Sequence, residues 1–326
     1  MTSECNTGPS ARTEFIRAIP PERDVWFRSM APTTAQIRTT RHSVTQTCCS
    51  NCHKPKKEVI ELRKCSKCKS AWYCSKKCQK ENWKDHKAFC HHAERGITRL
   101  INAFLANPIL RVNLEACLAL NFDLLKKPAP DTPFMACVDV GLEPSDITVF
   151  LRLYAGMYGN TEPEEIEGML QINAVTPTPQ SITPHPHRLD RWREKRKQLC
   201  ANGQASTPVV IVEFVSNGAP GAYSCVLPIQ PLILMIVKEN KPFEYLSALT
   251  GRSSSPMSAT ACLEFINNFI RSDTQNQQLL RMNMREEDRE TIRATGRGVE
   301  HTMPIAILKE KMSRERIYNT YEKVDS

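Results

Sequence analysis

Apolar residues recur at helical spacing just after residue 93. They fall at i, i+3, i+4, i+7 and i+8 in the series Ile97, Leu100, Ile101, Phe104 and Leu105. This spacing places one apolar stripe along a helix, which Pro108 should end. We expect a second helix to end before Pro128 and to bury the apolar series Leu110, Leu114, Cys117 and Leu118.

The pattern changes beyond residue 130, where short runs are rich in β-branched and aromatic residues. Such runs predict strands over 134–140, 147–153, 209–215 and 223–227, with a weaker one over 169–175. Prolines followed by a charged run predict an exposed insertion with a helix over 176–207. We therefore expect an α+β fold in which helices accompany a mixed, mostly antiparallel sheet.

The clearest single helix is predicted to begin with Ser255 as its cap and Pro256 in its first turn. Its buried stripe would comprise Ala259, Cys262, Leu263, Ile266, Phe269 and Ile270. Residues 1–47 lack apolar periodicity and are predicted to be a flexible tail. Charge dominates residues 285–326, which predicts a charged helical segment and a tail. The α+β domain is thus expected over 93–284.

The segment 48–92 differs in composition from the rest of the chain. It holds eight of the 14 cysteines, and its 12 Lys and Arg against four Asp and Glu account for most of the net charge of +9. So polar a segment has no apolar core in which to bury thiols. The chain shows neither an apolar secretory segment nor a run that could span a bilayer. We expect an intracellular protein, nuclear or cytoplasmic and without membrane association, where clustered thiolates hold metal.

Four pairs of metal-ligand residues follow one another in this segment. Two pairs have C-x2-C spacing and two have an i, i+4 spacing, which brings both ligands to one face of a helix. The eight residues are Cys49, Cys52, Cys65, Cys68, Cys74, Cys78, His86 and Cys90. Eight ligands make two tetrahedral sets, and sulfur with imidazole selects zinc. Because protein fills every position, the two zinc sites are predicted to be structural.

Spacing alone leaves two points open. The pairs may combine in sequence order or may alternate between the two metals. Cys48 could replace its neighbour Cys49 with x3 spacing, and His91 and His92 stand beside Cys90. The x2 and x3 spacings favour Cys49 and Cys90 as the ligands.

The whole pattern over 49–90, with "YCS", "CQ", a Trp and "HK" between the last ligands, resembles the MYND-type zinc finger. The resemblance implies a cross-braced finger in which first and third pairs share one zinc, and second and fourth pairs share the other. One zinc would be held by Cys49, Cys52, Cys74 and Cys78. The other would be held by Cys65, Cys68, His86 and Cys90. The region after the finger weakly resembles that of uncharacterised fungal MYND-finger proteins.

MYND fingers are protein-interaction modules, and some bind short proline-rich peptides in a groove. The residues that line this groove correspond here to Gln79 and Trp83, one helical turn apart. A simpler interpretation is that Trp83 packs between the zinc loops. The lysines partly offset the thiolate charge, and the remainder could contact an acidic protein or nucleic acid. Few aromatics and no base-reading helix argue against nucleic acid.

Motifs for catalysis are missing from the sequence. Methyltransferases that carry this finger begin their catalytic domain before it and contain an Asn-His-Ser-Cys segment, and neither feature is present. His187 and Asp190 are three residues apart, so "HPHRLD" does not supply the His-x-Asp pair of prolyl hydroxylases. Phosphate-loop, dinucleotide-binding, metalloprotease and serine-hydrolase motifs are missing too. We therefore expect a non-enzymatic adaptor with no catalytic residues. The alternatives are a nucleic-acid-associated regulator that uses the basic finger, and an enzyme of unseen type in 93–284.

Overall fold

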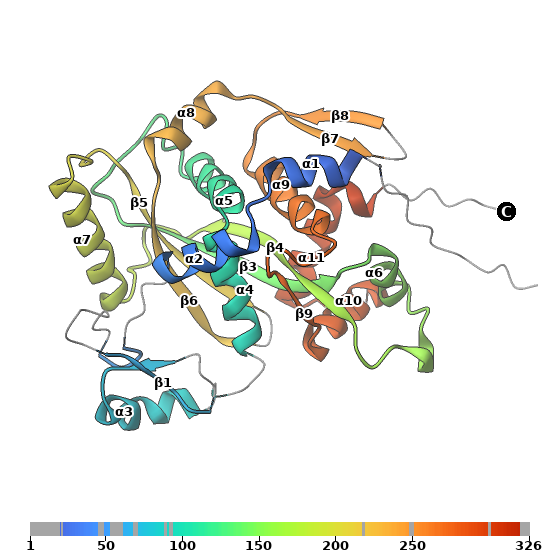
Figure 1. Cartoon of the computed structure of the whole chain (residues 1–326), viewed down its shortest axis with the longest axis horizontal. Helices are drawn as coiled ribbons and strands as arrows, with labels where there is room; N and C mark the ends of the chain where they lie inside the picture. The colour runs from blue at the N-terminus through green and yellow to red at the C-terminus, as the bar shows by residue number, and fades with distance from the viewer. Residues whose placement is uncertain are drawn as a thin grey trace, which may run out of the picture.

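The computed structural model describes residues 20, 22–44, 49–52, 61–67, 71–87, 90, 94–216, 219–247, 251–298 and 301–319 (Figure 1). The helices are α1 (Glu22–Met30), α2 (Thr34–Val44), α3 (Lys76–His86), α4 (Glu94–Ala106), α5 (Pro108–Asn121), α6 (Ile147–Tyr154), α7 (Pro186–Ala201), α8 (Pro231–Glu239), α9 (Ala259–Ser272), α10 (Glu286–Arg297) and α11 (Met303–Arg314). Short 3-10 turns are η2 (Gly159–Thr161) and η3 (Arg316–Tyr318). The strands are β1 (Arg63–Lys64), β2 (Trp72–Tyr73), β3 (Phe134–Pro144), β4 (Glu167–Pro177), β5 (Val209–Ser216), β6 (Ala219–Pro228), β7 (Phe243–Ser247), β8 (Gly251–Ser255) and β9 (Arg281–Asn283).

A five-stranded sheet in the order β6-β5-β3-β4-β9 forms the centre of the fold. Only the pair β3–β5 is parallel, and the other three pairs are antiparallel. The register of β3 with β4 shifts between Asp139 and Val140, where Asn173 is the extra residue. The predicted α+β fold with a mixed, mostly antiparallel sheet is confirmed.

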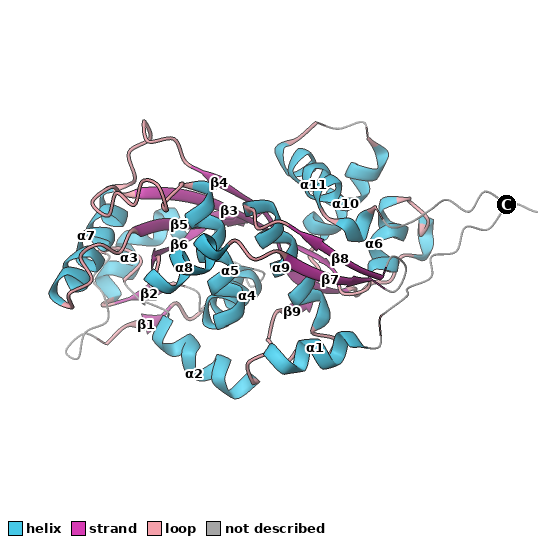
Figure 2. Ribbon diagram, turned by 90° about the horizontal axis from the view of Figure 1, so that it is seen from above, coloured by secondary structure: helices cyan, strands magenta, loops and turns pink. Residues whose placement is uncertain are grey.

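Helices cover both faces of this sheet (Figure 2). Alternate residues of β3 from Ala136 to Leu142 face the main core, which α4, α5 and α9 complete. On the opposite face, Met135 packs with Trp192 of α7. Farther along that face, Glu143 of β3 lies beneath α11. Since both faces are covered, the central strands read as nearly continuous apolar runs, and their composition predicted β3 and β5.

Residues 22–44 differ from the predicted flexible tail. They form α1 and α2, whose side chains Phe27 and Ile37 are buried in the main core. The Phe27 ring lies 5.1 Å from that of Phe269 in α9, and α2 packs against α4. Phe27 and Ile37 are the only hydrophobic residues of the described part of this segment that are buried, so the segment carries no long periodic stripe. The remainder of the predicted tail lies outside the described residues.

The predicted strand over 147–153 is wrong, because these residues form α6. Asp146 caps the helix by accepting from the Thr148 amide, and Phe150, Leu151 and Leu153 are buried. Burial of these side chains against the sheet outweighs the strand preference of the β-branched residues. The helix after Ser255 also begins later than predicted, since Ser255 ends β8 and Ser258 caps α9.

The segment after residue 284 is helical, as the charged run indicated, but it belongs to the same core and is not a separate unit. Lys311 of α11 is fully buried and donates to the carboxylate of Glu143. That carboxylate also accepts from Arg271, at 3.2 Å, and from Tyr318. Burial opposes ionisation, but the charges of Lys311 and Arg271 keep the pKa of Glu143 below its usual value. Glu315 accepts from Arg271 at 2.8 Å and completes this buried ionic cluster.

The apolar helices α4 and α5 bear on the expectation that the chain contains no segment able to span a bilayer. No single helix in the described ranges is long and apolar enough to cross a membrane. The segments Gly96–Ala106 and Pro108–Asn121 meet that criterion only when taken together, and they are bent by 87° at their junction.

Candidate metal centre

A two-stranded ribbon and one helix build the cysteine-rich segment. Arg63 pairs with Tyr73 and Lys64 with Trp72 to join β1 to β2, and α3 follows at once. The hydroxyl of Ser75 caps α3 by accepting from the backbone N–H of Cys78. This cap fixes the first turn of α3, and therefore the direction of the Cys78 sulfur.

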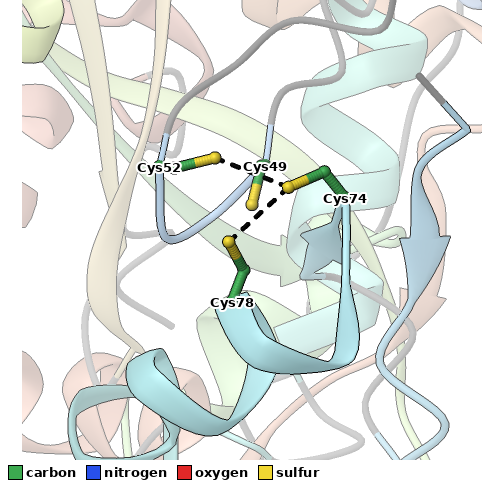
Figure 3. A group of neighbouring side chains, drawn as sticks. All are labelled: Cys49, Cys52, Cys74 and Cys78. Atoms are coloured by element: carbon green, nitrogen blue, oxygen red, sulfur yellow. Dashed lines mark hydrogen bonds between the residues drawn. The ribbon is translucent and has the colours of Figure 1, made fainter. Parts of the chain in front are cut away.

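The first ligand set comes from two places in this segment. Cys49 and Cys52 lie in a turn before the ribbon, while Cys74 and Cys78 lie at the start of α3 (Figure 3). The sulfur of Cys74 is 3.5 Å from the sulfurs of both Cys52 and Cys78. All four sulfurs lie within 4.8 Å of one another and point to a common centre. A tetrahedral zinc with bonds of about 2.3 Å separates its sulfurs by about 3.8 Å, so this set fits zinc.

The thiols of this set differ in acidity. Burial disfavours the Cys49 thiolate, but backbone N–H groups of Cys52, Cys74 and Asn51 lower the Cys49 pKa to about 6. Hydrogen bonding to the sulfurs of Cys78 and Cys52 raises the Cys74 pKa to about 12. The Cys49 thiol is thus more acidic and the Cys74 thiol less acidic than a free cysteine, because the four sulfurs share their hydrogen bonds unequally.

The second set combines Cys65, His86 and Cys90, whose ligand atoms also lie within 4.8 Å of one another. The sulfurs of Cys65 and Cys90 are 3.8 Å apart and both residues are buried. Three of the four predicted ligands therefore converge. The fourth, Cys68, lies outside the described residues, as do Cys48, His91 and His92.

The two sets interleave along the chain, as the family resemblance implied and as spacing alone left open. Pairs one and three share the first centre, and members of pairs two and four share the second. The small core between them contains Leu62 and Tyr73, both buried. So small an apolar core contributes little to the stability of a segment of this length.

Comparison with known families agrees with this geometry. A family model described as MYND finger matches residues 49–90. A second model, described as a domain of unknown function (DUF8205), matches residues 94–318, more than two thirds of the chain. The chain belongs to the DUF8205 family. It carries a zinc-binding MYND finger, which is in general a protein-interaction module, ahead of the DUF8205 domain. Neither the curated proteins nor the solved structures gave a match.

The DUF8205 match extends well beyond the predicted domain end at residue 284. It includes α10, α11 and η3, which agrees with the buried cluster around Lys311 and Glu315. It begins with α4, so α1 and α2 pack on the DUF8205 domain from outside the matched region.

The two residues predicted to bind peptide lie on α3, one turn apart. Gln79 is half-buried, and Trp83 has 39% of its surface exposed. The Trp83 ring contacts the ring of His86 edge-on, with centroids 5.9 Å apart. Trp83 therefore packs against a predicted metal ligand and is still open to solvent. The sequence analysis did not identify that contact with His86, although the i, i+3 spacing of the two residues signals it.

Proposed function

We propose that this chain is a non-enzymatic intracellular adaptor whose finger binds a short, proline-containing peptide of a protein partner. Gln79 and Trp83 are the residues proposed to contact that peptide. The DUF8205 domain would be brought to the partner through the finger. In this proposal both metal centres hold zinc, two ions per chain, and their role is structural.

The exposed indole of Trp83 is the observation that carries the proposal. An indole is costly to leave in water, and here its edge is supported by the His86 ring. An amide side chain one turn away can hydrogen-bond an extended backbone. Proline-containing segments are extended before they bind, so docking them on an aromatic ring costs little conformational entropy.

Peptide binding by matched variants tests this function. A library of proline-containing peptides is titrated against the full-length zinc-loaded protein, and hits are measured again with Trp83→Ala and Gln79→Ala. Loss of a buried aromatic anchor should weaken binding about thirtyfold, equivalent to about 2 kcal/mol. Trp26→Ala is the control, since Trp26 in α1 is equally exposed, at 37%, but lies on the DUF8205 domain.

Zinc content must be measured on each variant, because Trp83 contacts a ligand. Two zinc ions per chain in every protein, with binding lost only in the finger variants, support the proposal. Peptide hits that bind Trp83→Ala as tightly as the parent would overturn it. A single zinc per chain would contradict the two-ion part alone.

A further inference from the structure

Exposed lysines run along α3, and three of them form a stripe that includes Trp83. Lys76, Lys80, Trp83 and Lys87 stand at i, i+4, i+7 and i+11. At 3.6 residues per turn these positions lie within about 60° of one another around the helix axis. All four side chains are exposed. Figure 1 places α3 at the outer edge of the molecule, away from the central sheet.

The lysines of this stripe keep their charges available. Lys77, which lies to the side of the stripe, approaches Glu81 at 3.9 Å, and Glu81 also accepts from Asn51 at 2.8 Å. Within the described residues, no ion pair is formed by Lys76, Lys80 or Lys87. The only described cation–π contact in the finger uses Lys64, whose amine lies 4.6 Å from the Trp72 ring centre. The stripe therefore combines unpaired positive charge with one exposed aromatic ring.

The length of the stripe defines what it can hold. Eleven residues of helix at about 1.5 Å each extend about 16 Å from Lys76 to Lys87. An extended peptide rises about 3.3 Å per residue, so five or six residues match this length. If an apolar residue of the peptide lies over Trp83, the peptide residues on one side of it lie beside Lys80. Those on the other side lie beside Lys87. Acidic residues at those neighbouring positions complement the charge of the stripe.

Single-stranded nucleic acid is the alternative ligand to an acidic peptide, because it also carries regularly spaced negative charge. Proteins that bind it without sequence preference stack successive bases on several aromatic rings. The stripe offers one ring, and the other finger indole, Trp72, is half-buried beneath Lys64. The observations therefore favour a peptide.

We infer that the finger selects peptides in which acidic residues flank the apolar residue that meets Trp83. This inference rests on the proposed function and adds a charge requirement to it. Trp83 supplies the anchor, while Lys80 and Lys87 select the flanks. Each exposed pair contributes modestly, so two acidic flanks together should tighten binding about tenfold at low salt.

Three synthetic peptides test the charge requirement. They share one proline-containing apolar centre and differ only in flanks of Asp, Asn or Lys. Dissociation constants are measured by fluorescence anisotropy with full-length zinc-loaded protein at low and high salt. We expect the Asp peptide to bind about tenfold more tightly than the Asn peptide, with most of this difference lost at high salt. The double variant Lys80→Glu, Lys87→Glu should reverse the preference.

Lys77→Glu is the control, because it lies on the same helix to one side of the stripe. Its charge change equals that of Lys80→Glu or Lys87→Glu alone, so these two single variants are measured beside it. Lys77→Glu should leave the preference for Asp flanks nearly unchanged. Equal binding of the Asp and Asn peptides, or an equal loss of preference in the control, overturns the inference. If peptides of all three charges bind and Trp83→Ala removes binding, the proposed function stands without the charge requirement. A single-stranded oligonucleotide that binds more tightly than the Asp peptide and displaces it overturns the inference as well.

Discussion

Glu115 gives the stability of this protein a pH dependence that one substitution can isolate. Glu115 belongs to α5, and its side chain lies between α5 and the start of α8. The residue is 3% exposed. Burial raises its pKa to about 7, although the nearby charge of Arg111 and the backbone N–H of Gln230 oppose the rise. The Arg111 Nε lies 3.1 Å from the carboxylate. The carboxyl is therefore about half protonated near neutral pH.

The sign and size of the effect follow from the two states of the chain. The folded protein holds the proton up to about pH 7, whereas the unfolded chain releases it at its ordinary pKa of 4.5. Folding stability therefore falls as pH rises from 4.5 to 7, and it is constant beyond. At about 1.4 kcal/mol per pKa unit, this loss amounts to about 3 kcal/mol.

Glu115→Gln removes this loss while keeping the size and the acceptor of the side chain. At pH 4.5 variant and parent should have similar free energies of unfolding. At pH 8 the variant should be more stable by about 3 kcal/mol. Urea unfolding followed by helical circular dichroism at several pH values measures the difference, and contributions of all other groups cancel between the two proteins. A difference that does not change between pH 4.5 and 8 would refute the raised pKa of Glu115.

Further outcomes are expected elsewhere in the chain. Gly296→Ala should cost about 1–3 kcal/mol or more in thermal unfolding, because a Cβ there would lie 1.7 Å from the carbonyl oxygen of Tyr154 in α6; an unchanged melting temperature contradicts this packing. Lys311→Met should cost about 3–5 kcal/mol in urea unfolding, since it leaves Glu143 without one of its buried partners, and a neutral result would show that the cluster rearranges. Below about pH 5, protons should displace zinc from the finger, which a zinc-sensitive dye detects as released metal. A chelator at neutral pH should do the same while the DUF8205 domain still unfolds in one cooperative transition; loss of the whole transition would mean that finger and domain share one folding unit.

Much of the sheet could be predicted from the sequence because its strands are buried on both faces. The β-branched and aromatic residues of β3 and β5 are sufficient to predict these two strands. The same criterion failed for α6, whose residues have strand-like composition. Its helical signal was present in the spacing of Ile147, Phe150, Leu151 and Tyr154 behind the cap Asp146. The composition of this segment favours a strand and its spacing favours a helix, and the structure follows the spacing.

Other features could not be predicted because they depend on residues far apart in the chain. Glu143 and Lys311 are separated by 168 positions, and neither stands in a motif. Phe27 and Ile37 are single anchors whose burial requires α9 and α4 to be in place. The finger is the opposite case. Its ligand spacing is local, so the sequence indicated which residues converge, while their interleaved pairing came from the resemblance.

Because α2 contacts α4, loss of metal from the finger should also affect the stability of the α2–α4 contact. The finger leaves the domain after α2 and returns at α4, so it is attached at both ends. An unfolded finger would be a closed loop of roughly 50 residues, whose closure costs about 3 kcal/mol. This loss of chain entropy destabilises the α2–α4 contact whenever zinc is absent. Replacing the finger with a short flexible linker should strengthen the attachment of α2, because a shorter loop costs less to close.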